Sequence, residues 1–217
     1  MKKKLILGIT GVFLVLALSF CFASYMTGSA DNSKELFQMN GDTLVKYLGT
    51  DELVKVPGNV KIIEKGAFEN NDFIKKVILP NNLEVIEYNA FTECDSLLEI
   101  EIPDSVTQIG SAAFANCKAL CDVYIGKSVT DIGSGIFAGC SSLKEVDVSE
   151  KSTTFTCLDG VLLNAERTVI YEMLPGREKS FYIMNDRVVE IKQYAFWGCN
   201  SLEHIILSDK MESIAIN

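Results

Sequence analysis

Several residue types on which catalytic and metal sites depend are scarce in this sequence. It contains one histidine, His204, one tryptophan and four prolines in 217 residues. A Ser-His-Asp or Cys-His site would have to use His204, which is expected at an outward strand position. No His-Glu-x-x-His, P-loop or G-x-G-x-x-G motif is present. We therefore expect a protein that is not an enzyme and has no cofactor and no metal.

Positive charge is also in short supply. The chain has 20 lysines and arginines against 29 acidic residues, which gives a net charge of −9. An acidic surface disfavours nucleic acid and anionic lipid as partners, and it favours basic proteins or cations. Simple solubility explains the excess acidity equally well.

The one long uncharged run stands near the N-terminus. Lys2-Lys3-Lys4 precedes the uncharged residues 5–23, which end in the small-x-small sequence Cys21-Phe22-Ala23. This pattern is typical of a secretory signal peptide, so cleavage is predicted, which would change the net charge to −12 by removing three lysines. There are two alternatives: the segment is retained as a membrane anchor, or Cys21 is lipidated. We expect no membrane contact outside residues 5–23. All three predict a secreted or cell-surface protein.

The rest of the sequence repeats itself with a period of 23 residues. Phe68, Phe91, Phe114 and Phe137 are 23 residues apart, and Phe196 follows 59 residues later. Aliphatic residues recur eight and five residues before each phenylalanine, and six, nine and eleven residues after it. One such unit cannot bury its own apolar edge, so the copies are expected to stack as the coils of a solenoid.

Each repeat contains two segments that read as extended chain. The L-x-x-I-x-I segment alternates like a short strand, and its copies are expected to stack into a parallel sheet. The V-x-x-I segment is a second, shorter extended stretch, and A-F-x-x-C turns the chain back. The predicted fold is a mostly β solenoid of about 23 residues per coil, with turn or short-helix returns and little helix outside the signal segment.

The repeat resembles a known family. Residues 102–125 match I-P-D-S-V-T-x-I-G-x-x-A-F-x-x-C-x-x-L-x-x-I-x-I almost throughout, which is similar to the BspA-like branch of bacterial leucine-rich repeats. The resemblance is strong over residues 60–217 and weak over residues 37–59. It implies a leucine-rich repeat solenoid and a secreted or surface-exposed binding protein, since some members are adhesins for host matrix proteins or other bacteria.

The recurring cysteines are interpreted as core residues. Three residues after each phenylalanine the sequence has a small side chain that would fit a buried ladder. Only Cys117 and Cys121 approach the spacing of zinc ligands. Strands about 4.8 Å apart would allow a disulfide between successive coils as the alternative. The residues at this position are Asn71, Cys94, Cys117, Cys140 and Cys199.

Two segments depart from the period. Residues 149–187 interrupt it and are interpreted as an irregular long repeat inside the array, in which Asp159-Gly160 between apolar runs predicts a hairpin. Residues 37–59 contain a related segment, in which Phe37 corresponds to Phe155 at an offset of 118. The predicted organisation is a signal peptide or anchor (1–23), a linker (24–36), an N-terminal capping hairpin-like segment (37–59) and a repeat array (60–217) with an irregular insert (149–187).

The last repeat stops in mid-unit. Met211 and Ile214 continue two aliphatic columns, and the next phenylalanine would fall at position 219. We expect an apolar end face, which terminal repeats usually cap. An unusual natural end, a truncated chain and a partner that covers the face remain alternatives.

Outward strand positions form the candidate binding surface. Residues eight and ten after each phenylalanine should point away from the core, and three successive repeats have acidic or aromatic residues there. Like charges stacked so closely cost stability, which gives the patch weight as a ligand surface; a solvated strand face is the other interpretation. A basic protein segment would suit it better than a divalent cation, because strand carboxylates do not close an oxygen cage. The residues are Glu99, Glu101, Asp122, Tyr124, Glu145 and Asp147.

The function predicted from the sequence is binding without catalysis. We expect a secreted or surface-held protein that adheres to a host matrix or bacterial surface protein and does not bind nucleic acid. The alternative is an envelope scaffold or assembly subunit that self-associates through its uncapped C-terminal end. Trp197 is interpreted as a cover for the insert, with a contact residue as the alternative.

Overall fold

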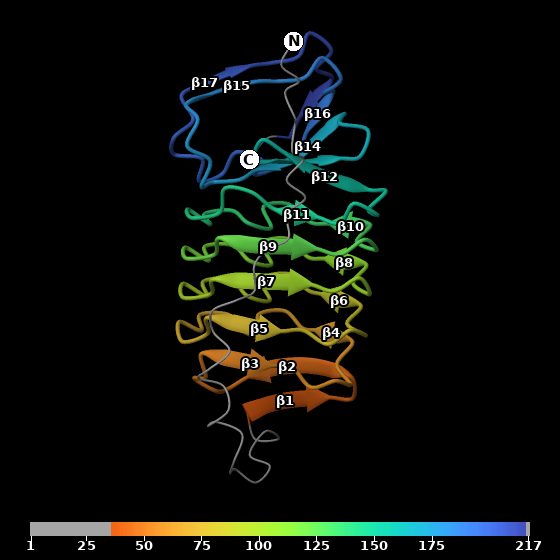
Figure 1. The fold of residues 1–217 in the computed structure, drawn as a ribbon, viewed down its shortest axis with the longest axis vertical. Helices are drawn as coiled ribbons and strands as arrows, with labels where there is room; N and C mark the ends of the chain where they lie inside the picture. Colours follow the sequence, from red (N-terminus) through yellow and green to blue (C-terminus); the bar gives the residue numbers. More distant parts are fainter. Residues whose placement is uncertain (1–35, 216–217) are drawn as a thin grey trace, which may run out of the picture. The chain divides into compact units, whose positions relative to one another are not determined.

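The computed structural model describes residues 36–215, which form a β-solenoid (Figure 1). The predictions for residues 1–23, for 24–35 and for 216–217 lie outside the described residues. Each regular coil contributes two short strands, one to each of two sheets. Between residues 36 and 215 no helix has the length and apolar character needed to cross a membrane.

The L-x-x-I-x-I segments form a parallel sheet, which we call sheet B. Residues one period apart lie side by side, so Ile100 is next to Val123 and Ile102 next to Ile125. These four residues are at most 3% exposed because they point into the core. The strands are β3 (Leu53–Lys55), β5 (Lys76–Ile78), β7 (Glu99–Ile102), β9 (Asp122–Ile125) and β11 (Asp147–Val148).

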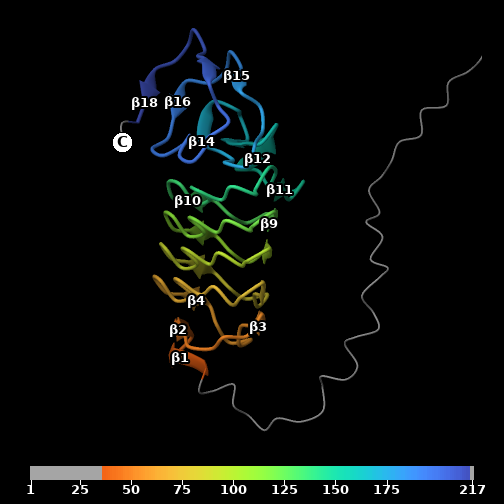
Figure 2. The ribbon, with the colours of Figure 1, turned by 90° about the vertical axis from the view of Figure 1, so that its left-hand side faces the viewer.

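The V-x-x-I segments form a sheet of their own, sheet A, on the other side of the core (Figure 2). Its first two strands make an antiparallel hairpin, and the others are parallel. The sequence predicted these segments as extended but not that they pair into a second sheet. The strands are β1 (Phe37–Asn40), β2 (Thr43–Tyr47), β4 (Ile62–Ile63), β6 (Val85–Ile86), β8 (Gln108–Ile109) and β10 (Asp131–Ile132).

The recurring phenylalanines form a stack between the two sheets. Phe68, Phe91, Phe114 and Phe137 are at most 1% exposed. Their successive ring centroids are 4.6, 5.1 and 5.7 Å apart, with interplanar angles of 7°, 9° and 23°. Each such contact adds roughly 0.5–1.5 kcal/mol to the free energy gained from burial alone. The ladder predicted from the period is therefore the central element of the core.

The cysteines three residues further on are hydrogen-bond donors as well as core residues. The thiols of Cys94, Cys117 and Cys140 donate to the carbonyl oxygens of the phenylalanines one coil earlier, at 3.1 Å in each case. Asn71 fills the position with its amide, which donates to the Gly49 carbonyl at 2.9 Å. Hydrogen bonding to the thiol of the next coil, together with burial, raises the pKa of Cys94 and of Cys117.

The prediction that the cysteines pack in the core is confirmed for these three, which are fully buried, and Cys199 is half-buried. Within residues 36–215 every cysteine is a free thiol, so the disulfide alternative is not realised. The sequence did not reveal the hydrogen bond, which explains why an asparagine can replace the cysteine.

Ion pairs connect neighbouring coils at the surface. Each joins two residues that are one period apart in the sequence, and all have exposed or half-exposed side chains, so each contributes at most about 1 kcal/mol. The pairs are Glu52–Lys75, Lys61–Glu84, Lys76–Glu99, Asp95–Lys118 and Asp104–Lys127, with N···O distances of 2.7, 3.0, 2.7, 2.7 and 3.4 Å.

The chain beyond residue 148 continues the stack with two further sheets. Sheet C follows sheet A on one side and sheet D follows sheet B on the other, as Figures 1 and 2 both show. Sheet C consists of β12 (Phe155–Leu158), β13 (Val161–Asn164), β14 (Val169–Met173), β16 (Glu190–Ile191) and β18 (Ser213–Ile214), and sheet D of β15 (Phe181–Ile183) and β17 (His204–Ile206).

The hairpin predicted at Asp159-Gly160 is confirmed. β12 and β13 are antiparallel, and both turn residues have positive φ, 53° and 69°, as a two-residue turn of type I′ requires. β1 and β2, which the sequence aligned with this segment, also form an antiparallel hairpin, but in its Gly41-Asp42 turn only Gly41 has positive φ.

The insert forms a further coil of the solenoid, as an irregular long repeat should, but the sequence did not show which residue replaces the phenylalanine. Met173 stands 23 residues before Phe196, and its carbonyl accepts a hydrogen bond from the Cys199 thiol at 3.3 Å, as the phenylalanine carbonyls do elsewhere. β15 and β17 pair at the same offset of one period, with Phe181 beside His204. A methionine therefore takes the place of the phenylalanine in this coil.

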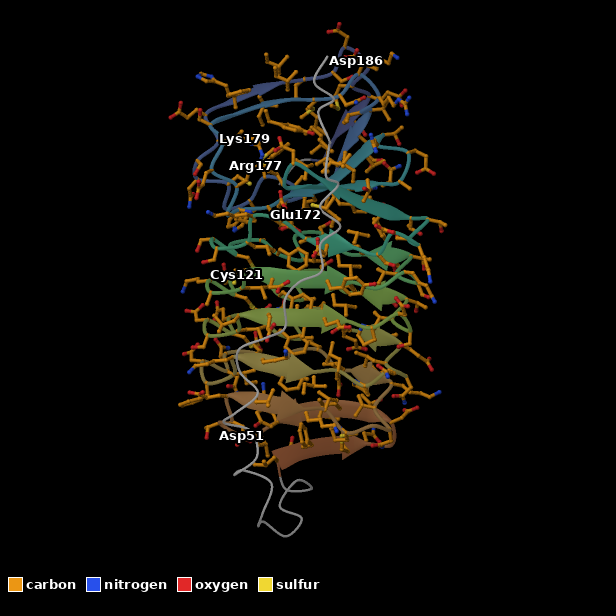
Figure 3. The ribbon with its side chains drawn as sticks, in the orientation of Figure 1. Asp51, Cys121, Glu172, Arg177, Lys179 and Asp186 are labelled. Carbon is orange, nitrogen blue, oxygen red and sulfur yellow. The ribbon has the colours of Figure 1, made fainter. Side chains whose placement is uncertain are left out.

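Two buried polar side chains hold the insert in place, Glu172 by a contact with a regular coil and Arg177 by contacts within the insert (Figure 3). The main-chain N–H of Phe114 donates to a carbonyl of the next coil, but that of Phe137 donates to the carboxyl oxygens of Glu172, at 3.1 and 3.2 Å. Burial raises the pKa of Glu172, which is 1% exposed, to about 8. The carboxyl group thus replaces the carbonyl that a regular coil would have supplied.

Arg177 is the second of these residues and is 8% exposed. Its guanidinium donates to the carbonyl and the carboxylate of Asp159, at 2.9 and 3.0 Å, and to the carbonyl oxygens of Lys179 and Phe181. Lys179 also pairs with Asp159, and these two partners lower the pKa of the Asp159 carboxyl. The hairpin tip is fixed in this way against the start of β15.

Candidate functional site

The predicted site residues gather on the outer face of sheet B. Glu99 lies beside Asp122 in one row, and Glu101, Tyr124 and Asp147 lie side by side in a second row. Strand pairing alone produces this arrangement, since side chains one period apart must share a face. Glu99 and Tyr124 are half-buried, whereas Glu101, Asp122, Glu145 and Asp147 are exposed.

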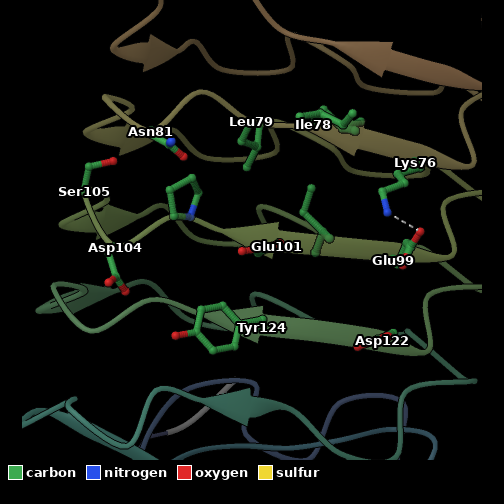
Figure 4. Close-up of a pocket in the computed structure, with 13 residues that line it drawn as sticks. Lys76, Ile78, Leu79, Asn81, Glu99, Glu101, Asp104, Ser105, Asp122 and Tyr124 are labelled. Atoms are coloured by element: carbon green, nitrogen blue, oxygen red, sulfur yellow. Dashed lines mark ion pairs between the residues drawn. The ribbon is translucent and has the colours of Figure 1, made fainter. Parts of the chain in front are cut away.

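A groove of about 720 Å³ crosses β5, β7 and β9 on this face (Figure 4). Four of the six predicted residues line it, namely Glu99, Glu101, Asp122 and Tyr124. Glu145 and Asp147 do not line the groove but continue the same rows on the β11 side. A second hollow of about 550 Å³ adjoins the groove and shares Ile78, Leu79 and Asn81 with it.

The turns that follow the strands supply a wall whose residues were not predicted from the sequence. Asn81, Pro103, Asp104 and Ser105 line the groove on this side. The Asp104 carboxylate accepts a hydrogen bond from the main-chain N–H of Lys127 at 3.0 Å, which is the main reason that its pKa is lowered. The repeated Pro-Asp-Ser and Pro-Asn-Asn sequences after the strands were the signal that could have identified this wall.

The charge of the groove is predominantly negative. Lys76 makes a 2.7 Å ion pair with Glu99 at the β5 end. Within residues 36–215 no ion pair involves Glu101, Asp122, Glu145 or Asp147. A cationic ligand would therefore meet carboxylates that have no internal partner.

Apolar surface lies between the charged groups. Ile78 is 41% exposed although it is on a strand, and Leu79, Pro103 and the ring of Tyr124 continue the apolar floor. A concave surface of this kind, with an apolar floor and a few convergent polar groups, is typical of a binding site.

The described residues offer little for metal or acid–base chemistry. No group of three or more His, Cys, Asp or Glu side chains between residues 36 and 215 is arranged to hold a metal ion. His204 is exposed on β17, as predicted, and does not line the groove. Trp197 is 54% exposed and makes an edge-on contact with Tyr194 of its own coil, at 5.9 Å between ring centroids. The interpretation of Trp197 as a cover for the insert is therefore not supported.

The stacked parallel strands, the 23-residue coil and the open groove on the strand face define a leucine-rich repeat protein, a class of generally non-catalytic binding scaffolds. Residues 50–157 and 178–217 match the BspA type leucine rich repeat region in six copies. The match covers more than half of the chain, which therefore belongs to this family of bacterial surface proteins, as the resemblance predicted.

Solved structures with the same fold come from bacteria. The pneumococcal vaccine antigen PcpA is 27% identical, with a TM-score of 0.60, over 75% of this chain and 46% of that one. A leucine-rich repeat protein from Eubacterium ventriosum is 18% identical, with a TM-score of 0.64, over 79% and 55%. One from Bacteroides ovatus is 24% identical, with a TM-score of 0.55, over 78% and 42%. The chain thus spans about half the length of these proteins. No curated protein matches the sequence.

Proposed function

We propose that this protein is a secreted or cell-surface binding protein without catalytic activity, which holds a basic segment of another protein in the groove on sheet B. Its biological role is adhesion to a host matrix protein or to another cell-surface macromolecule. The observation that carries the proposal is the groove itself, where four predicted side chains meet and the carboxylates of Glu101 and Asp122 make no ion pair within residues 36–215.

Export of the protein is supported by two observations. Residues 1–23 have the basic start, apolar centre and small-residue end of a secretory signal, and the family consists of bacterial surface proteins. Expression of the full chain in a bacterial host, followed by fractionation and determination of the N-terminal residue, tests this part. We expect a chain outside the cytoplasm that begins at Ser24, and an uncleaved cytoplasmic chain would contradict it.

Binding is tested with residues 24–217 and a panel of host matrix and bacterial surface proteins. A ligand held by exposed charges should bind more weakly at high salt, because ions screen such contacts. The site variant replaces Glu99, Glu101, Asp122 and Asp147 with Lys. The matched control replaces four exposed acidic residues outside the groove with Lys, namely Asp131, Glu166, Asp186 and Glu212.

The expected result is a salt-sensitive ligand that the control variant binds and the site variant does not. A ligand that both variants bind equally well would exclude the groove as its site. If no member of the panel binds, adhesion is not the function.

A second candidate function is assembly through the last coil. Ile205, Leu207 and Ile214 occupy ladder positions but are 37%, 46% and 50% exposed, whereas the equivalent residues Ile100, Ile102 and Ile109 are at most 3% exposed. A surface of this composition favours contact with another apolar surface. Sedimentation equilibrium of the wild type and of Leu207→Lys tests it, since a self-associating wild type and a monomeric variant are expected. The charge reversal on sheet B should leave such an assembly intact.

A further inference from the structure

Glu101 and Tyr124 are neighbours inside the groove. They are register partners on β7 and β9, so their side chains leave the same face of the sheet about 4.8 Å apart. Both residues line the groove. Figure 4 shows the ring of Tyr124 nearly face on and next to Glu101, so that one face of the ring is turned outward. A carboxylate and an accessible aromatic face are thus side by side.

The row of side chains that contains Glu101 and Tyr124 supplies no cation of its own. In the other outward row of these strands, Lys76 lies beside Glu99 and pairs with it at 2.7 Å. One period before Glu101 the chain has Ile78 instead. Within the described part of the chain, no ion pair involves Glu101 and no lysine or arginine lies over the Tyr124 ring. The carboxylate and the ring are therefore both available to a ligand.

The chain itself contains a cation that contacts both a tyrosine ring and a carboxylate. The guanidinium carbon of Arg177 lies 5.5 Å from the centre of the Tyr182 ring, and the same guanidinium donates to the Asp159 carboxylate at 3.0 Å. Arginine suits this arrangement because its planar guanidinium stacks on an aromatic face and presents two donors to a carboxylate. A ligand arginine could make the same two contacts in the groove.

Lysine would use less of this pair of groups. Lys192 lies over Tyr171 and pairs with Glu190, but its Nζ is 5.8 Å from the ring centre, close to the limit of about 6 Å for a cation–π contact. An ammonium group is a strongly hydrated point charge, so it gains mainly from the carboxylate. A guanidinium holds water more weakly and gains from the ring as well.

We propose that the groove selects arginine over lysine in the basic segment, and that Glu101 and Tyr124 form the arginine site. The guanidinium lies on the outward face of the Tyr124 ring and donates two hydrogen bonds to the Glu101 carboxylate. With N···O distances of about 2.8 Å, the central carbons of such a pair are about 4 Å apart, which is close to the strand spacing of about 4.8 Å. This inference rests on the proposed function and names the side chain that the ligand must carry.

The test compares two labelled twelve-residue peptides, with residues 24–217 as the protein and fluorescence anisotropy as the readout. One peptide repeats Gly-Arg-Ser four times and the other repeats Gly-Lys-Ser four times, so length, charge and flexibility are the same. We expect the arginine peptide to bind about tenfold more tightly. Equal or tighter binding by the lysine peptide would overturn this inference and leave the proposed function in place. If neither peptide binds, both are overturned.

Variants of Tyr124 show whether its ring is the origin of the preference. Tyr124→Leu keeps an apolar side chain but removes the ring, so the ratio of the two affinities should fall from about ten to about two, whereas Tyr124→Phe should preserve it. The matched control, Tyr88→Leu, removes a tyrosine that is 42% exposed but does not line the groove, and it should leave the ratio unchanged. Thermal melting shows whether each variant is folded. A ratio that stays near the wild-type value in a folded Tyr124→Leu variant would contradict the inference.

A variant of Glu101 tests the carboxylate. Glu101→Gln keeps the shape of the side chain but removes its charge, so the arginine peptide should bind about fivefold more weakly. Glu166→Gln neutralises an exposed acidic residue outside the groove and should bind the peptide as the wild type does. Equal affinities of the wild type and the Glu101→Gln variant would show that the arginine does not bind at this position.

Discussion

The regular coils up to residue 148 and the irregular part beyond it stack strands in the same way but are held together differently. In the regular coils, four parallel phenylalanine rings and a row of buried thiols repeat the same contacts. In the irregular part, a methionine and a half-buried phenylalanine take those places. Two buried polar side chains add to these contacts, since Glu172 accepts a hydrogen bond from Phe137 of the regular coils and Arg177 joins the hairpin tip to β15 within the irregular part.

The difference shows two ways to build one solenoid. A ladder distributes stability over many similar contacts, since each repeat interacts only with its neighbours. The irregular part concentrates stability in a few buried polar groups, and removing one partner of such a group leaves the other unsatisfied. Substitutions in the two parts should therefore lower the free energy of unfolding by different amounts and for different reasons.

The largest loss in the free energy of unfolding is expected when one ring of the phenylalanine stack is removed. Phe114→Ala removes a fully buried ring that contacts Phe91 and Phe137, and we expect it to lower the free energy of unfolding by about 4 kcal/mol. Phe196→Ala should cost less than half as much, since Phe196 is half-buried. Urea unfolding followed by circular dichroism measures both, and equal losses would show that the ladder has no special role.

A slightly smaller loss in the free energy of unfolding is expected when the contacts of Arg177 with the tip of the β12–β13 hairpin are removed. Arg177→Ala leaves the carbonyl oxygens of Asp159, Lys179 and Phe181 without their donor, which should cost about 3 kcal/mol. The fluorescence of the single tryptophan, Trp197, should report this loss at lower urea than circular dichroism does. Coincident transitions would show that the two parts unfold as one unit.

The buried carboxyl group predicts a dependence on pH. The pKa of Glu172 is about 8 in the folded protein and 4.5 in the unfolded chain. Between these values the folded state binds the extra proton, so stability falls as the pH rises from 4.5 to about 8 and is constant above it. From pH 6 to pH 8 the loss should be about 2 kcal/mol. Urea unfolding of the wild type and of Glu172→Gln at both pH values tests this, and we expect the variant to show no such loss.

The smallest effect is expected in the cysteine row. Cys117→Ala removes a fully buried thiol and its hydrogen bond to the Phe91 carbonyl, which should cost about 1 kcal/mol. Cys199→Ala, at the half-buried equivalent position, should cost less. Melting temperatures of the two variants give the comparison, and a larger loss at Cys199 would contradict it.

The sequence predicted the regular coils well because identical surroundings impose identical residues. The columns around Phe91 and Phe114 gave the period, the strand and the inward face of each side chain. The same columns placed Glu101, Tyr124 and Asp147 together, since strand pairing follows directly from the period.

The features of the fold and of the groove that the sequence did not predict depend on contacts that occur only once in the structure. Met173 was not predicted at the phenylalanine position because an unbranched apolar residue has no distinctive pattern, and Glu172 resembles an ordinary surface residue until its surroundings are known. The wall at Asp104 arises from a turn that approaches the strand face only in the folded chain. The turn sequences one period apart mark this wall, but Met173 and Glu172 leave no periodic signal in a single sequence.

The ion pairs between successive coils have a consequence for arrays built from identical units. Stacking places the same position of successive coils side by side, so a copied unit would put like charges next to each other. Here the paired positions differ in sign, as in Lys76 beside Glu99 and Asp95 beside Lys118. The chain itself fixes the order of the coils, and an array assembled by copying a single unit would have to change at the surface before such pairs could form.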